Sequence, residues 1–363
     1  MVGSVAALSA YDGLGVVVHG SSGCWFYPSS LLRVDLGCTD LTSADAVLGA
    51  ERRVRETVEA MLPRYRAVAV VNTGVPGIVG EDLAGARADL PVTVVDAPGF
   101  LGGAWAGHAR AIAALEPVVD GTADRIGIDG LSPLDPFARG NLHEIERLLR
   151  IAGAAPGTCY AGGTIESIGR AAPVSVVANP AFAAGPGDRA GDLLGFDGVL
   201  ATFDRLGDRD DRIDVCPVTV ECAAAEERCV HACDKYLRRH DPPRAALFGE
   251  GAYIAAAGRL LDRYLGADCA VLGYRDLPPP SDRHAAVRAD DLGSVEEILA
   301  RAEPDLVLGS SFEQRLRPEA AFVPLAPPLR GRWRLAATPF AGVEGVLALV
   351  EAVLNACTAK RKA

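Results

Sequence analysis

The sequence predicts an α/β protein built on parallel sheets, and two observations carry that prediction. Short β-branched runs recur along the chain, and most of them end in Gly, Pro or Asn. Between many of these runs lie stretches rich in alanine and leucine with helical spacing. Strands that alternate with helices form parallel sheets with helices on both faces. The near-continuous apolar character of the strands indicates burial on both sides.

The elements can be placed in order along the chain. Strands are expected at Leu14–His19, Val68–Asn72, Val92–Asp96, Arg125–Ile128, Val174–Ala178, Ala245–Phe248, Ala270–Gly273 and Asp305–Gly309. Helices are expected at Ala44–Leu62, Leu142–Ala152, Ala252–Leu265 and Ser294–Ala302. These elements predict three successive domains, at residues 1–121, 122–240 and 241–363, the last of which begins at the proline-rich linker Asp241–Arg244.

Composition excludes several classes of function. A net charge of −11 disfavours nucleic acid and anionic membranes as partners. Aromatic residues make up only 6%, which disfavours stacking platforms for single strands. No apolar run approaches the ~20 residues that span a bilayer, and the N-terminus lacks the pattern of a signal peptide, so a cytoplasmic protein is expected. An odd number of cysteines, nine, does not suggest a disulfide framework.

The stretch Gly13–Cys24 is the first candidate functional motif, because a predicted buried strand ends there in a glycine-rich turn. Gly20 and Gly23 permit tight or positive-φ backbone, which would bring Cys24 and bare peptide N–H groups close to a bulky group. A thiolate at the end of a parallel strand can ligate a metal cluster. The alternative is a strand–helix loop that happens to contain a thiol.

The segment Asn72–Asp82 has the same plan, with a strand, a flexible loop and then acidic residues. Glu81 and Asp82 are expected to complement the dipole at a helix start rather than to perform chemistry. The glycines of Gly249–Gly251 also follow a strand, but their spacing does not match a dinucleotide-binding motif. No Walker A sequence is present, so the chain is not expected to bind ATP itself.

A second group of cysteines has helical spacing. Cys222, Cys229 and Cys233 fall at i, i+7 and i+11 and therefore share one face of a helix. They are either small core residues or, with His231 nearby, ligands for zinc or an iron–sulfur cluster. Motifs of serine hydrolases and zinc peptidases are absent from the sequence, which disfavours both classes.

Several segments together resemble the nitrogenase component 1 family, whose NifD-like subunits pass electrons from an iron–sulfur cluster to a bound cofactor or tetrapyrrole. The matching segments are His19–Cys24, Thr42–Ala50, Asn72–Leu83, Ala97–Phe100, Pro304–Glu313 and Pro339–Gly345. They extend over nearly the whole chain in the family's order. The resemblance implies three Rossmann-like domains and a homodimer with a [4Fe-4S] cluster near the subunit interface. It also implies a separate ATP-dependent, NifH-like reductase that docks to deliver electrons.

Within this family, the chain resembles reductive cyclases that act on nickel-sirohydrochlorin a,c-diamide. The resemblance rests on its compact length and on the segments Leu131–Phe137 and Ser310–Glu313. Those enzymes make a precursor of factor 430, the nickel tetrapyrrole of methanogenesis. The resemblance therefore implies a nickel tetrapyrrole as substrate, single-electron reduction of its ring, and closure of a lactam. ATP would be used only by the partner reductase.

The sequence departs from the family's pattern at the expected cluster site. No cysteine precedes Cys24, and Gly74 stands where many relatives have cysteine. One cysteine per chain is too few for a cluster with four ligands. A symmetric dimer doubles each ligand, so Cys24 and one further thiol per chain would complete the set. Cys38 is the nearest candidate, with a core thiol as its alternative role, and Cys159 or a non-cysteine ligand comes next.

His19 is the first candidate for a proton donor because it lies beside the cluster turn, although it could instead stabilise the strand end through a hydrogen bond. Two other functions share these motifs: a scaffold that holds a cluster or tetrapyrrole during cofactor assembly, and a reductase of another tetrapyrrole. A plain α/β binding module is the remaining alternative.

Overall fold

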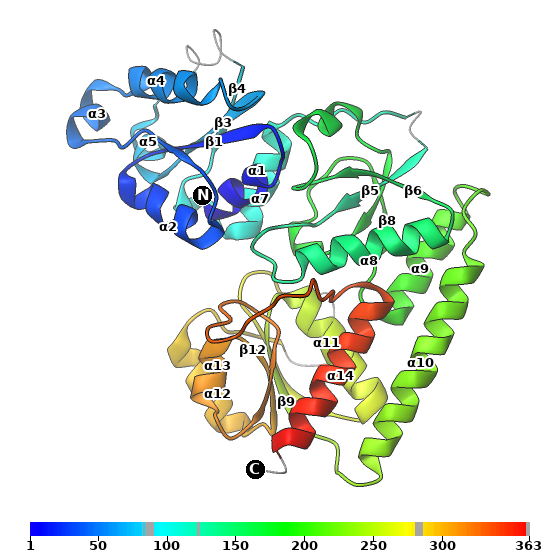
Figure 1. The fold of residues 1–363 in the computed structure, drawn as a ribbon. Coiled ribbons are helices and arrows are strands. Elements are labelled where there is room, and N and C mark those ends of the chain that lie inside the picture. The colour runs from blue at the N-terminus through cyan, green and yellow to red at the C-terminus, as the bar shows by residue number, and fades with distance from the viewer. Residues whose placement is uncertain (82, 84–90, 122–123, 280–285, 361–363) are drawn as a thin grey trace. The chain divides into compact units, whose positions relative to one another are not determined.

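The computed structural model describes residues 1–81, 83, 91–121, 124–279 and 286–360. The chain divides into two compact units. The first comprises residues 1–134, 157–175 and 182–188, and the second comprises residues 135–156, 176–181 and 189–363. Figure 1 labels many of the helices and strands.

The first unit holds a four-stranded sheet with the order β2-β1-β3-β4 (Figure 1). Its strands are β1 (Leu14–His19), β2 (Gly37–Cys38), β3 (Ala67–Asn72) and β4 (Val92–Asp96). Every pairing is parallel, and all six residues of β1 are buried. An apolar strand without alternation fits a sheet that is covered on both faces. Because the strands are parallel, their carboxyl ends meet at one edge, which positions the candidate site.

Helix α1 precedes β1, and the other helices of this unit follow its strands in sequence. They are α1 (Val2–Ser9), α2 (Ser22–Leu32), α3 (Ser43–Leu48), α4 (Glu51–Met61), α5 (Gly74–Val79), α7 (Ala104–Ala114) and the short 3₁₀ helix η1 (Gly99–Leu101). The predicted single helix at Ala44–Leu62 is wrong, because α3 and α4 are separate. Thr42 begins α3 with a capping box, and Gly49 ends it with φ +85°.

A second four-stranded sheet has the order β6-β5-β7-β8. Its strands are β5 (Arg125–Asp129), β6 (Ala155–Cys159), β7 (Val174–Val177) and β8 (Asp188–Asp192). The helical elements that belong to this part of the chain are α8 (Ala138–Ile151), η2 (Ile165–Arg170), η3 (Pro180–Phe182), α9 (Gly195–Gly207) and α10 (Cys216–Leu237).

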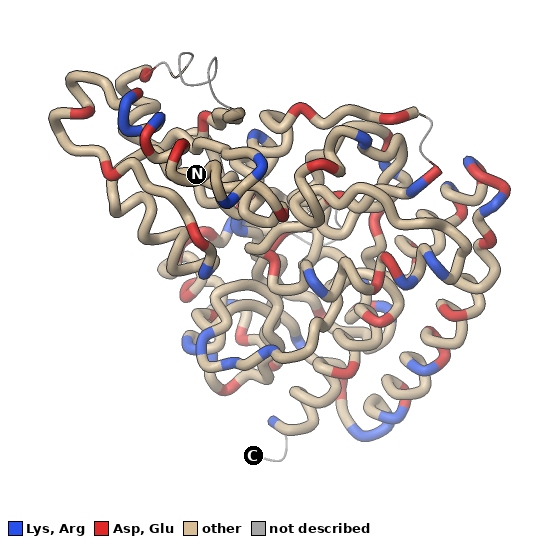
Figure 2. Tube along the Cα trace, turned by 45° about the horizontal axis from the view of Figure 1, so that its top comes forward, with Lys and Arg blue, Asp and Glu red and all other residues tan. Residues whose placement is uncertain are grey.

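The second unit contains a five-stranded parallel sheet with the order β11-β10-β9-β12-β13. Its strands are β9 (Arg244–Gly249), β10 (Asp268–Tyr274), β11 (Ala286–Arg288), β12 (Leu306–Gly309) and β13 (Ala321–Pro324). Its helices are α11 (Gly251–Leu265), α12 (Leu292–Ala302), α13 (Ser311–Leu316) and α14 (Gly342–Lys360). Acidic and basic residues are interspersed along the trace (Figure 2).

The predicted strands are confirmed to within two residues at either end, and the α/β class with parallel sheets is confirmed. Five further strands, β2, β6, β8, β11 and β13, were not expected from the sequence. These strands are short or contain Gly, Pro or Asp, which have low strand propensity. Pairing with a neighbouring strand therefore determines their conformation. Each sheet lies within one of the three predicted domain ranges, but the domain boundaries themselves stay a prediction.

Helix α14 qualifies by length and composition as a candidate membrane span among the described residues, with a mean hydropathy of 1.4. The sequence expectation that no run approaches this length therefore needs correction. The helix packs on β13 and on α8, α9, α10 and α11 of its own unit. An apolar helix with such neighbours is typical of the core of a globular protein, and one such helix is weak evidence for a span.

Candidate metal centre

The loops that follow β1 and β2 meet at the carboxyl edge of the first sheet. The backbone N–H of Gly20 donates to Thr39 Oγ1 at 3.1 Å, and the N–H of Leu41 donates to the Gly20 carbonyl at 2.9 Å. The N–H of Ser22 donates to Asp40 Oδ1 at 3.2 Å, which ties the start of α2 to the loop after β2. These hydrogen bonds hold the two loops together.

That arrangement brings Cys24 and Cys38 to the same edge. Cys24 lies in the first turn of α2, and Cys38 ends β2 beside Val18 of β1. Both thiols are partly exposed. Burial is the largest influence on Cys38 and raises the pKa of its thiol.

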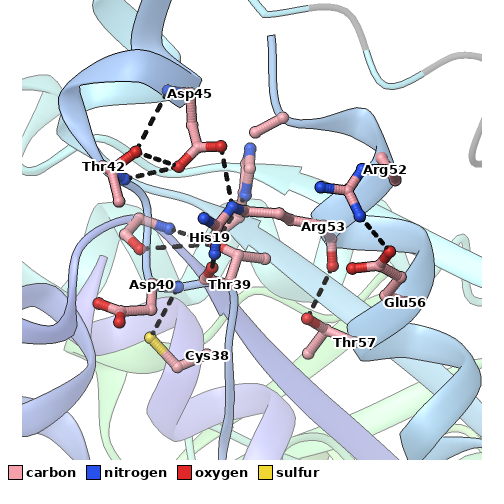
Figure 3. Close-up of polar contacts among 12 residues, drawn as sticks. His19, Cys38, Thr39, Asp40, Thr42, Asp45, Arg52, Arg53, Glu56 and Thr57 are labelled. Carbon is pink, nitrogen blue, oxygen red and sulfur yellow. Dashed lines mark hydrogen bonds and ion pairs between the residues drawn. The ribbon is translucent and has the colours of Figure 1, made fainter.

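The surroundings of the two sulfurs suit thiolate ligands. The backbone N–H of Asp40 donates to Cys38 Sγ at 3.3 Å (Figure 3), and Ser21 Oγ donates to Cys24 Sγ at 3.7 Å. Hydrogen bonds to sulfur stabilise the charged form and tune a bound cluster. Among the described residues no group of three or more His, Cys, Asp and Glu side chains could hold a metal ion. Cys24 and Cys38 as cluster ligands therefore stay a prediction.

His19 at the end of β1 is fully buried, and both of its ring nitrogens are engaged. Nδ1 lies 3.0 Å from Thr39 Oγ1, and Nε2 lies 3.0 Å from Glu81 Oε2. Because a carboxylate only accepts, Nε2 carries the proton of the neutral ring and Nδ1 accepts from the Thr39 hydroxyl. Burial lowers the pKa of His19, with Glu81 opposing the shift. The geometry suits a residue that positions the loops, and the role of proton donor stays a prediction.

Glu81 has partners in two other segments of the first unit. Helix α5 ends at Val79, and Glu81 follows it in the chain. Its Oε1 accepts from the backbone N–H of Ala50 at 2.6 Å, which satisfies the start of α4, while its other oxygen bonds His19. A carboxylate does complement a helix start here, but across 31 residues of sequence. Asp82 lies outside the described residues.

The two glycines of the turn behave differently from the expectation, since neither has a positive φ. A Cβ on Gly20 would lie 2.1 Å from Thr73 Oγ1, whereas a Cβ on Gly23 would meet only Ser21 Oγ at 3.8 Å. Thr73 is fully buried and its hydroxyl donates to the His19 carbonyl at 2.8 Å, so it cannot easily move away. Close approach, and not φ, therefore requires glycine at position 20.

Replacing Gly20 with alanine is expected to lower the free energy of unfolding by about 1–3 kcal/mol, the range for inserting a methyl group into a packed site. Gly74→Ala is the matched control, because a Cβ there meets no atom within 4 Å. Urea denaturation of the two variants and the parent checks this difference. Equal midpoints for the two variants would contradict the packing argument.

A set of large apolar side chains is exposed on the helices that follow this edge. It is called the apolar edge here, and its members are Phe26, Tyr27, Leu31, Val47, Leu48, Val75, Ile78, Val79, Phe100 and Leu101. They belong to α2, α3, α5 and η1, the elements that follow β1, β2, β3 and β4 in turn. Exposed apolar surface gathered in one region marks an interaction site.

The cysteines of α10 belong to the core instead. Cys222, Cys229 and Cys233 are each at most 2% exposed. Burial raises the pKa of the Cys222 thiol to about 12 and that of Cys233 to about 11. Burial on one face of α10 is typical of small core residues. His231 is exposed, so it does not join them, and the core alternative holds.

The second unit contains a buried polar cluster that the sequence did not reveal. Tyr253 Oη donates to Asp135 Oδ2 at 2.6 Å, and Asn179 Nδ2 donates both to Asp135 at 3.1 Å and to Glu250 Oε2 at 2.9 Å. Asn141 Nδ2 donates to Tyr253 Oη at 2.8 Å. Desolvation, followed by the charge of Asp135, raises the pKa of Glu250 to about 8. Glu250, the N-cap of α11, is therefore part of a buried hydrogen-bonding network.

Comparison with known families identifies the family of this chain. The sequence matches the nitrogenase component 1 type oxidoreductase family over residues 1–181 and 186–358. The chain belongs to the nitrogenase component 1 family. Proteins of this family normally bind iron–sulfur clusters and work with a NifH-like reductase.

Individual relatives of this component 1 chain are distant. A nitrogenase iron–molybdenum cofactor biosynthesis protein NifE of Rippkaea orientalis is 30% identical over 34% of this chain and 32% of the relative. A nitrogenase molybdenum–iron protein beta chain of Frankia alni is 27% identical over 43% of this chain and 34% of the relative. The chain thus spans about a third of these relatives. The solved structure "Nitrogenase Cp1 at pH 6.5" has the same fold, with a TM-score of 0.84 and 17% identity over 99% of this chain and 92% of that structure.

Proposed function

We propose that this component 1 chain is the catalytic subunit of a two-component reductive cyclase that acts on nickel-sirohydrochlorin a,c-diamide. The observation that carries the cluster part of the proposal is that two hydrogen-bonded loops at one sheet edge bring partly exposed thiols, Cys24 and Cys38, to the same edge. Family membership supports electron transfer, and the resemblance of Leu131–Phe137 and Ser310–Glu313 to nickel-tetrapyrrole cyclases supports the substrate.

The cluster would be shared between two copies of the chain. A [4Fe-4S] cluster held by Cys24 and Cys38 of each copy has four thiolates, and it would supply single electrons to the substrate. The apolar edge beside these thiols supports a second copy as its partner, because a symmetric interface presents the same surface twice. In this arrangement His19, Thr39 and Glu81 hold the two thiol-bearing loops in register. We place the dimer in the cytoplasm.

In this proposal the chain and the partner reductase have different roles. Electrons arrive from an ATP-dependent NifH-like reductase, and the chain contributes thiol ligands and binding surface for the tetrapyrrole. The ring is reduced in single-electron steps and an amide arm closes a lactam, which yields the seco precursor of factor 430. His19 acts as a positioning residue in this proposal, because both of its nitrogens already have partners.

Reconstitution tests the proposal. The protein is loaded anaerobically with iron and sulfide and mixed with reductase, ATP and nickel-sirohydrochlorin a,c-diamide, and pigment absorption is followed. Conversion that requires both reductase and ATP is the expected result. An unchanged pigment, in the presence of a cluster-loaded dimer and an active reductase, would overturn the assignment.

A second candidate function, a scaffold for cofactor assembly, is favoured by one observation: the relative in Rippkaea orientalis is a cofactor biosynthesis protein. A scaffold would bind the same pigment and release it unaltered to a partner. A reductase for another tetrapyrrole is distinguished in the same assay, because it would convert a different pigment and leave nickel-sirohydrochlorin a,c-diamide unchanged.

A further inference from the structure

A basic segment in the second unit has no part in the thiol site. It is called the arginine segment here and comprises residues 330–335, between β13 and α14, with the sequence Arg-Gly-Arg-Trp-Arg-Leu. Residues 320–343 contain these three arginines and no acidic residue, although the chain as a whole carries a net charge of −11. A local positive region in an acidic protein attracts an anion.

Each arginine of the segment lies over an aromatic ring of its own unit. The guanidinium of Arg330 lies 5.6 Å from the ring centroid of Phe312, that of Arg332 4.8 Å from Phe322, and that of Arg334 4.5 Å from Phe137. A guanidinium stacked on a ring is oriented by it and keeps N–H groups at its edge for a carboxylate.

No carboxylate pairs with these arginines in the described part of the chain. The hydrogen bonds of Arg334 go to the carbonyls of Pro136 and Pro324, at 3.1 and 3.4 Å. Asp135 acts on Arg334 only electrostatically, and its oxygens already accept from Tyr253, Asn179 and the Phe137 N–H. Arg147 of the same unit, in contrast, binds two glutamates. The three guanidinium groups are therefore available to an external anion.

The residues between the arginines add a flat apolar surface. Trp333 is 92% exposed and Leu335 is 95% exposed. Beside Arg334 opens a cavity of about 220 Å³ that is lined mainly by apolar side chains, among them Phe340 and Leu349. This is smaller than the ~300–1,000 Å³ of a complete small-molecule site. It can hold one arm or edge of a ligand whose body lies outside against Trp333.

We propose that the arginine segment is the docking site for a planar macrocycle with several carboxylate arms, in which Trp333 stacks on the ring and Arg330, Arg332 and Arg334 bind the arms. This inference rests on the proposed function and deepens it, since an acidic tetrapyrrole has this chemistry. An acidic protein surface would match the charge, but not the stacking surface beside an apolar cavity.

Binding without reductase or cluster turnover tests the site directly. Uroporphyrin III, a flat macrocycle with eight carboxylates, is titrated against the purified protein and binding is followed by tryptophan quenching and porphyrin absorption. R330Q/R332Q/R334Q is expected to bind at least tenfold more weakly, and W333A several-fold more weakly. W333F should bind nearly as tightly as the parent but lose much of the quenching. Citrate, which has carboxylates without a ring, should compete poorly.

The matched control is R64Q/R212Q/R301Q, which removes the same charge from arginines that are 59–76% exposed elsewhere. It should bind within twofold of the parent. Circular dichroism and the single variant R332Q separate loss of binding from loss of folding. Each of three results would overturn the inference. The parent and R330Q/R332Q/R334Q could bind the porphyrin with equal affinity, the parent could fail to bind it, or the variant could be defective only in reductase binding. Failure of the proposed function is distinguishable, because the pigment would then bind in an arginine-dependent manner without being converted.

Discussion

Cys24→Ala is expected to leave the reconstituted protein without its iron–sulfur cluster. In a set of two thiols from each of two copies, this one substitution removes two of four ligands. Iron and sulfide analysis should fall from about one cluster per two chains to near background, and the EPR signal of the reduced cluster should disappear. Cys38→Ala should have the same effect, because Cys38 supplies the other pair.

The control for this experiment is Cys216→Ala, which removes an exposed thiol at the start of α10, far along the chain from the candidate site. Its iron content should match that of the parent. Full iron in Cys24→Ala would refute the cluster site. Full iron in Cys38→Ala alone would remove Cys38 from the ligand set and direct attention to Cys159, which is also partly exposed.

Glu250→Gln is expected to stabilise the protein at alkaline pH. Burial and the charge of Asp135 raise the pKa of Glu250 from the ordinary 4.5 to about 8. Between these values the folded protein holds a proton that the unfolded chain has released, so this group lowers stability progressively as the pH rises through that window. Glutamine keeps an oxygen that accepts from Asn179 but has no charge to bury. The variant's advantage should be near zero at pH 4.5 and reach roughly 3–5 kcal/mol above pH 8.

Urea denaturation of both proteins from pH 5 to pH 9 measures this difference. Glu296→Gln, at an exposed position on α12, is the control and should run parallel to the parent across the range. A constant difference between Glu250→Gln and the parent at all pH values would show that the carboxyl does not retain its proton in the fold.

The sequence by itself determined the alternation of strands and helices and hence the α/β class. Runs such as Leu14–Val18 are apolar without alternation, as is typical of strands that are buried on both faces. It also determined the family. Segments that resemble this family, among them His19–Cys24, occur in the family's order along nearly the whole chain. Local signals of this kind depend on residues that are neighbours in the chain, which is why they can be read directly.

Only the tertiary structure decided which residues meet. Cys38 ends a strand of two residues that has no propensity signal, and parallel pairing with β1 places it beside Val18, at the sheet edge that Cys24 follows. Glu81 was expected to act at a helix start of its own segment, yet it bonds His19 and the start of α4. The carboxyl of Glu250 looked like part of a glycine turn, and its raised pKa comes from burial near Asp135. Desolvation and contact are properties of the packed chain, and partners separated by 31 to 115 residues leave no periodicity in the sequence.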